Sequence, residues 1–242
     1  MNLKKSLSRL IVLAMLFTGC SNYQVKNEDI SLPDEATKQK TMTKVQNDVS
    51  EIIDKDYNYV LSNLGEPDVK AYWIDKNKVN NLENIDDIEN FTETNLVYLK
   101  NVSDEVTNSS ALYLQLKDEI VKKAQIVGYF GTNIMKNTNK SKILVDYYTN
   151  GDIVKIEDLD IKNLDEFIGI DSSNMEKIVG NNQQSYDAYL YDKVEKSISV
   201  YCLDSEDKLL GIFTKDNKIS EIKILDNKQE VVTEIEKILL DN

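Results

Sequence analysis

Apolar and polar residues alternate along this chain in short runs, which predict short helices and strands rather than long elements. Apolar residues between 45 and 64 recur at helical spacing, and Gly65 followed by Pro67 is typical of a helix end. The next run, 69–75, alternates in the manner of a strand. The pattern therefore begins with a helix followed by a strand.

Later runs of the same kind predict an α+β fold dominated by antiparallel strands. Asp118-Glu119 and Asp216-Asn217 lie between consecutive strand-like runs and predict hairpin turns, and Asn150-Gly151 predicts a third because both residues tolerate positive φ. The predicted strands are 69–75, 95–102, 111–116, 120–129, 142–148, 153–156, 186–191, 197–203, 208–215 and 218–225, and the later predicted helices lie near 82–88, 164–168, 175–179 and 228–242.

Two parts of the chain are similar to each other. Lys70-Ala71-Tyr72-Trp73-Ile74-Asp75 is matched by Asp187-Ala188-Tyr189-Leu190-Tyr191-Asp192, and each copy follows a helix-like run that ends in glycine. Val97-Tyr98 then matches Val200-Tyr201, and Lys117-Asp118 matches Lys215-Asp216, so the offset falls from 117 to 103 to 98. We expect one unit of short helices packed on a curved antiparallel sheet, used at 46–131 and 159–242. The hairpin 132–158 would link the units, and two unrelated segments of similar composition are the alternative.

The first 19 residues have the order of features of an export signal. Lys4, Lys5 and Arg9 precede the apolar run 10–17, and small residues lead to Cys20. The apolar run is shorter than the roughly 20 residues that span a bilayer as a helix.

This order resembles the bacterial lipoprotein signal, although Phe17 stands where such signals usually have leucine. The resemblance implies cleavage before Cys20, lipidation of Cys20 and attachment to the extracytoplasmic face of the cell membrane. An ordinary secretory signal, with Cys20 incidental, is the alternative. Residues 20–45 are polar and without apolar periodicity, which predicts a flexible tether. With Cys20 lipidated, Cys202 has no cysteine partner, so no disulfide is expected.

Charge and composition narrow the classes of partner. Removal of residues 1–19 takes away three cations and changes the net charge from −13 to −16. Nucleic acid is an unfavourable partner for so acidic a chain, because phosphate neutralisation needs clustered cations. The many Asn, Lys and Ile residues are typical of a low-GC Gram-positive bacterium.

Candidate chemistry is limited by the absence of histidine from the sequence. Without histidine, nucleophiles activated by imidazole and most zinc sites are excluded. A carboxylate pair remains open, but spacing singles out none of the 42 acidic residues. The sequence therefore predicts no catalytic residue, no metal ligand and no cofactor.

The run Leu64-Gly65-Glu66-Pro67 and its counterpart Val179-Gly180-Asn181-Asn182, each followed by strands, resemble the small repeat of SmpA/OmlA-type assembly lipoproteins and of the β-lactamase-inhibitor-protein fold. The second run lacks the proline. The resemblance implies helices on one face of a curved sheet and binding of another protein rather than catalysis. A Gram-positive source lacks an outer membrane, which argues against the assembly role.

Aromatic residues on the two similar strands are the candidate contact residues. Tyr72, Trp73, Tyr189 and Tyr191 would offer large amphipathic contact area if their sheet face is uncovered, and core packing is the alternative. We therefore expect a non-enzymatic binding lipoprotein that contacts an envelope protein through a sheet face. A carboxylate-based envelope hydrolase or its accessory subunit, or a carrier of an apolar ligand, are the alternative functions.

Overall fold

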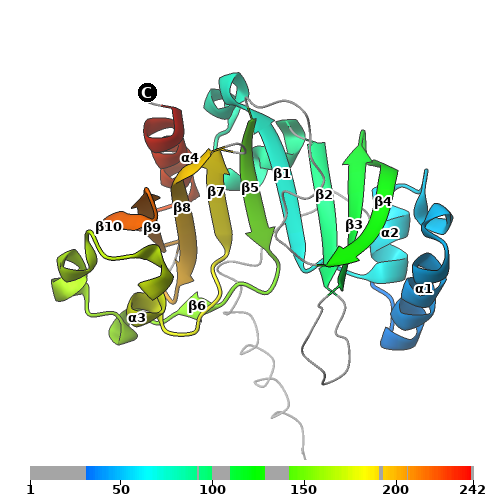
Figure 1. Ribbon diagram of the computed structural model, residues 1–242, viewed down its shortest axis with the longest axis horizontal. Coiled ribbons are helices and arrows are strands. Elements are labelled where there is room, and N and C mark those ends of the chain that lie inside the picture. The colour runs from blue at the N-terminus through cyan, green and yellow to red at the C-terminus, as the bar shows by residue number, and fades with distance from the viewer. Residues whose placement is uncertain are drawn as a thin grey trace, which may run out of the picture.

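The computed structural model of the chain describes residues 31–91, 93–99, 110–128, 142–190, 193–205 and 207–240. Its strands form one open, ten-stranded sheet in the order β10-β9-β8-β7-β5-β1-β2-β3-β4, with β6 beside β8 (Figure 1). The fold is α+β, as predicted. The strands are β1 (Val69–Asp75), β2 (Glu93–Leu99), β3 (Ser110–Lys117), β4 (Ile120–Gly128), β5 (Lys142–Tyr148), β6 (Ile153–Val154), β7 (Tyr186–Leu190), β8 (Lys193–Leu203), β9 (Leu209–Lys215) and β10 (Lys218–Leu225).

Helices in the described residues are short. The α-helices are α1 (Glu35–Asn47), α2 (Tyr57–Leu64), α3 (Glu176–Val179) and α4 (Lys228–Ile235), and the last continues as a π-helical turn, η8 (Glu236–Leu240). The 3-10 segments are η1 (Val49–Ile52), η2 (Lys76–Asn81), η3 (Ile85–Phe91), η5 (Ile156–Asp158), η6 (Ile161–Phe167) and η7 (Ser172–Asn174).

Two predicted elements differ from the structure. The tether was expected to reach residue 45, but residues 35–45 belong to α1, which Asp34 caps and which buries Val45 against the sheet. The hairpin at Asn150-Gly151 is wrong, because β6 pairs in parallel with β8 instead of returning along β5. The edge of β5 that a hairpin would need is occupied by β7.

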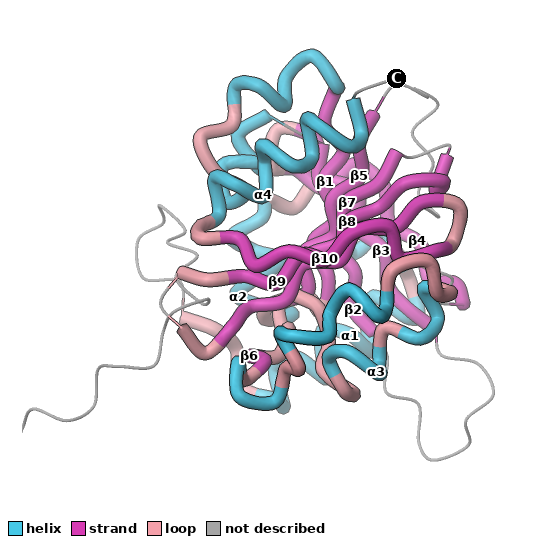
Figure 2. Tube along the Cα trace, turned by 90° about the vertical axis from the view of Figure 1, so that its left-hand side faces the viewer, coloured by secondary structure: helices cyan, strands magenta, loops and turns pink. Residues whose placement is uncertain are grey.

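Helices cover both faces of the sheet. Tyr72, Val145 and Ala188 are paired across three strands and face α4, so we call this side the α4 face. Helices α1 and α2 pack on the same side over β2 and β3. Helix α3 and segment η6 pack on the opposite side, the α3 face, over β8 to β10. Figure 2 shows α4 and α3 on opposite sides of β10. The helices therefore do not all lie on one face of the ten-stranded sheet.

The segment between β1 and β2 belongs to the core. Segments η2 and η3 bury Val79, Ile85 and Ile88 against α4 and the strands β5, β7 and β8. Lys228 of α4 pairs with Asp86 of η3 at 2.7 Å. A stretch rich in Asn, Asp and Lys thus connects the first strands of the chain to its last helix.

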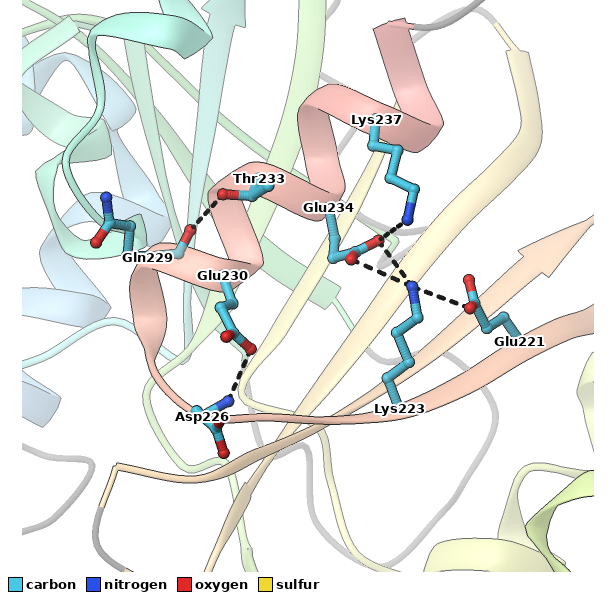
Figure 3. Close-up of polar contacts among 8 residues, drawn as sticks. All are labelled: Glu221, Lys223, Asp226, Gln229, Glu230, Thr233, Glu234 and Lys237. Atoms are coloured by element: carbon cyan, nitrogen blue, oxygen red, sulfur yellow. Dashed lines mark hydrogen bonds and ion pairs between the residues drawn. The ribbon is translucent and has the colours of Figure 1, made fainter.

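Helix α4 is also held to β10 by polar contacts (Figure 3). The Nζ atom of Lys223 lies 2.9 Å from a carboxylate oxygen of Glu221 and 3.2 Å from one of Glu234, and 5.4 Å from the centre of the Phe213 ring. Asn227 caps the helix by accepting a hydrogen bond from the Glu230 backbone N–H. The C-terminal helix is therefore fixed at its first turn and along one side.

Strands β7 to β10 pair in the same order and register as β1 to β4. Val69 is paired with Val97 and Val97 with Tyr113, and Tyr186 is paired with Val200 and Val200 with Gly211. These pairs are related by the offsets 117, 103 and 98 that relate the similar sequence runs. A register irregularity follows the second residue of the last strand in each series, and the tight turns before those strands hold Asp118, Glu119, Asp216 and Asn217 at positive φ.

The chain before each series also makes the same contacts. Asp56 forms an isolated bridge with Ile120, and Asp171 forms one with Lys218. Each aspartate caps the helical turn that follows it. Gly65 and Gly180 end these helical runs at positive φ, a conformation that glycine adopts without strain.

Candidate functional site

The predicted contact residues do not form one surface. Tyr72 and Trp73 are each 2% exposed, so both belong to the core. Tyr189 is partly exposed and lies on the α3 face, opposite to Tyr72. Tyr191 and Cys20 lie outside the described residues.

Two Asp-x-Tyr sequences meet on the α3 face at the middle of the sheet. Asp146 of β5 is paired directly with Asp187 of β7. The Tyr148 hydroxyl donates to Asp187 at 3.1 Å, and the Tyr189 hydroxyl approaches Asp146 at 3.5 Å, so the contacts cross between the strands. We call Asp146, Tyr148, Asp187 and Tyr189 the central polar cluster.

Burial and hydrogen bonding act in opposite directions on Asp187. Burial raises the pKa of its carboxyl group, while hydrogen bonds from Ser199, Gln184 and Tyr148 lower that pKa by a smaller amount. The Ser199 hydroxyl donates at 2.6 Å and the Gln184 amide at 2.7 Å. Burial and, to a smaller extent, the Asp187 charge raise the pKa of Tyr201 to about 12.

A depression of about 410 Å³ lies beside this cluster on the same face. Ser197 is paired with Tyr189 across β7 and β8, and the Ser197 and Thr214 hydroxyls are 2.7 Å apart. Segment η7 forms the other wall, where Asp171 accepts hydrogen bonds from Ser173. The lining residues are Asp171, Ser172, Ser173, Met175, Ser197, Thr214 and Asn217, which we call the hydroxyl pocket.

The hydroxyl pocket is polar and carries one charge. Hydrogen bonds from Ser173 lower the pKa of Asp171, so this carboxylate is ionised at neutral pH. Six of the seven lining side chains are polar. The pocket can therefore offer hydroxyl, amide and carboxylate hydrogen-bonding groups but no lining cation.

Cys202 differs from its prediction in one respect. It is buried on β8, as expected, and its sulfur accepts a hydrogen bond from Ser185 at 3.2 Å. It is, however, disulfide-bonded, whereas no disulfide was expected. The sequence contains one other cysteine, Cys20. Lipidation of Cys20, as the sequence leads us to expect, would leave no other cysteine of this chain to pair with Cys202.

Across the described ranges, no group of three or more Cys, Asp or Glu residues is placed to hold a metal ion. Nor does any helix in those ranges combine the length and apolar character that a membrane span needs.

Sequence reasoning missed Asp146 and Tyr148. The available signal was the repeated Asp-x-Tyr spacing at 146–148 and 187–189. Its meaning depends on the pairing of β5 with β7, which the incorrect hairpin prediction concealed. The hydroxyl pocket was missed because its walls are separated by about 20 to 45 residues of sequence.

No protein-family model, curated protein or solved structure matches this chain.

Proposed function

We propose that the chain is a lipid-anchored, extracytoplasmic binding protein whose α3 face contacts an envelope protein. The lipoprotein-like order of residues 1–20 supports the anchor. The observation that carries the contact surface is a partly exposed region at the middle of the α3 face. Trp73, Tyr113 and Leu144 of that face are buried, but Tyr148 and Tyr189 beside them are partly exposed, and the hydroxyl pocket lies on the same face.

Exposed tyrosines beside carboxylates suit protein recognition. A tyrosine buries a large area at low entropic cost and keeps a hydroxyl for hydrogen bonding. The net charge, −13 for the full sequence and −16 without residues 1–19, favours a partner with a basic contact surface. The apolar-carrier alternative gains no support from the hydroxyl pocket, because its lining is polar.

Site-specific crosslinking tests the surface. A photoreactive residue at Tyr189 should capture one envelope protein in membranes, whereas the same residue at Tyr59, exposed on α2, should not. Equal capture at both positions, or capture at 59 alone, would show that the α3 face is not the contact surface. A Cys20→Ala chain should lose the anchor and, with it, the membrane-bound capture.

We also infer that the fold consists of two tandem copies of one unit. The first unit comprises η1, α2 and β1 to β4, and the second comprises η6, η7, α3 and β7 to β10. Matching registers, bulges, left-handed turn residues and isolated bridges support this inference. Because β5 is inserted between β1 and β7, the copies are related by a rotation about the strand direction, which puts their helices on opposite faces.

A second candidate function is carboxylate-based hydrolysis, favoured by the direct pairing of Asp146 with Asp187. Paired residues on antiparallel strands have Cβ atoms about 4.5–5.5 Å apart, so their carboxyl groups can come close to each other. Retaining glycosidases use two carboxyl groups about 5–5.5 Å apart, one with a raised pKa. The raised pKa of Asp187 suits the acid role.

A wall-hydrolysis assay separates the two candidate functions. Hydrolysis should be absent from the purified chain if it only binds. If hydrolysis is present, it should be lost in Asp146→Asn and Asp187→Asn but retained in Asp226→Asn, whose carboxylate is exposed.

A further inference from the structure

The hydroxyl pocket of the second proposed unit has a corresponding position in the first. The backbone N–H of Tyr57 donates to the Glu119 carbonyl, and that of Ser172 donates to the Asn217 carbonyl, so Tyr57 and Ser172 occupy corresponding positions. The offset of 98 residues that relates β3 to β9 also relates Leu116 to Thr214, so these two residues occupy corresponding positions as well.

In the first unit this space is filled. The Tyr57 ring and Leu116 pack in one cluster with Val60 and Val121, and Leu116 is 4% exposed. In the second unit a serine replaces the tyrosine and a threonine replaces the leucine, leaving the pocket of about 410 Å³. The fold can therefore close this site with ordinary side chains, so the pocket is a property of these residues and not of the architecture.

The lining selects against several ligand classes. An anion would meet the Asp171 carboxylate and no lining cation. An apolar ligand would leave the Ser172, Ser197 and Thr214 hydroxyls without water. A neutral ligand rich in hydroxyl groups would instead exchange donors and acceptors with them.

The size and rim of the pocket suit a single ring. Ligand pockets range from about 300 to 1,000 Å³, and this one lies near the lower limit. Tyr189 is paired with the lining residue Ser197 and is partly exposed, although its hydroxyl is directed to Asp146 on the other side of β7.

We propose that the hydroxyl pocket binds a neutral saccharide unit. The ring occupies the volume that the Tyr57 and Leu116 side chains fill in the first unit, and the hydroxyl groups bond to Ser197, Thr214 and Asp171. This binding does not depend on the protein contact proposed above, because it requires only the pocket.

Amide NMR shifts on titration with N-acetylglucosamine and glucose test this proposal, with glucuronate and inorganic phosphate as anionic probes. Saturable shifts are expected with at least one neutral sugar, confined to amides of residues 171–175, 197, 214 and 217. No saturable shift with either sugar, or equal shifts with the anions, would overturn the proposal.

Variants that close the pocket complete the test. Ser172→Tyr with Thr214→Leu copies the first unit and should weaken sugar binding at least about tenfold without lowering Tm. If that double variant does not fold, Thr214→Val removes one hydroxyl at similar size and should weaken binding up to about tenfold. Ser220→Ala, at an exposed β10 position, should bind as the unaltered chain does. Unchanged binding in a folded pocket variant would refute the assignment.

Discussion

At the scale of single residues, the two proposed units place groups of opposite charge, a buried lysine and a partly buried aspartate, at one corresponding position. Lys70 of β1 is 2% exposed and pairs with Glu66 at 3.1 Å. Asp187 of β7, related to Lys70 by the offset of 117, is held by three hydrogen bonds instead. Lys70 is thus compensated by an ion pair, whereas Asp187 is compensated only in part, by hydrogen bonds from Gln184, Ser199 and Tyr148 of β5.

Replacing Asp187 with asparagine should change how stability depends on pH. Because burial raises the folded-state pKa of Asp187, its stabilising contribution is complete below the unfolded value of 3.8 and is lost as pH rises through the folded pKa. Relative to the unaltered chain, Asp187→Asn should therefore gain stability as pH rises above about 4. Urea unfolding between acid and neutral pH measures this difference.

Asp171→Asn is the matched control for that measurement. Hydrogen bonds lower the folded-state pKa of Asp171, so its contribution is lost as pH falls through the folded pKa and is complete above 3.8. The difference between this variant and the unaltered chain should have the opposite slope, confined to acid pH. Parallel pH profiles for the unaltered chain and Asp187→Asn would contradict the assignment of Asp187.

At the scale of elements, local pattern predicted strands well and pairing poorly. Alternation located β1, β3, β9 and β10 to within about one or two residues, because the side-chain period of a strand is a local property. The partner of β5 is not local, and the edge that β7 occupies was assigned to the hairpin at Asn150-Gly151. For the same reason the sequence indicated Tyr189 but not Asp146, whose carboxylate the Tyr189 hydroxyl approaches.

The two corresponding tight turns provide a stability prediction. Glu119 and Asn217 both have positive φ, 60° and 62°, a conformation that asparagine tolerates better than glutamate. Glu119→Asn should stabilise the chain by about 0.5–1 kcal/mol, and Asn217→Glu should destabilise it by a similar amount. Thermal unfolding measures both, and changes of the same sign would contradict this explanation.

At the scale of the whole molecule, the state of Cys20 determines how the chain is attached. We expect thioether lipidation of Cys20, which is incompatible with a disulfide to Cys202. Mass spectrometry of the N-terminal peptide from membranes, without reduction, should show acyl chains on Cys20. A peptide disulfide-linked to the one containing Cys202 would instead identify a secreted protein without a lipid.

The two proposed units should nevertheless unfold together. Segments η2 and η3, which lie between strands of the first unit, supply Val79, Ile85 and Ile88 to the cluster that holds α4 and the second unit's strands. Separating the units would expose apolar residues of this cluster to water, which costs free energy in proportion to the area exposed. We therefore expect one calorimetric transition, with calorimetric and van't Hoff enthalpies equal.

Two core substitutions test this coupling. Ile85→Ala should cost about 2–5 kcal/mol, because Ile85 is fully buried, and hydrogen exchange should accelerate in α4 although the substitution lies about 145 residues earlier. Leu64 is the buried last residue of α2 in the first unit. Leu64→Ala should cost a similar free energy of unfolding and accelerate amide hydrogen exchange in α2 first. Both variants should retain a single transition at lower temperature. A second transition in Leu64→Ala would mean that the second unit folds independently, and that the contact of η3 with α4 is too weak to join the two halves.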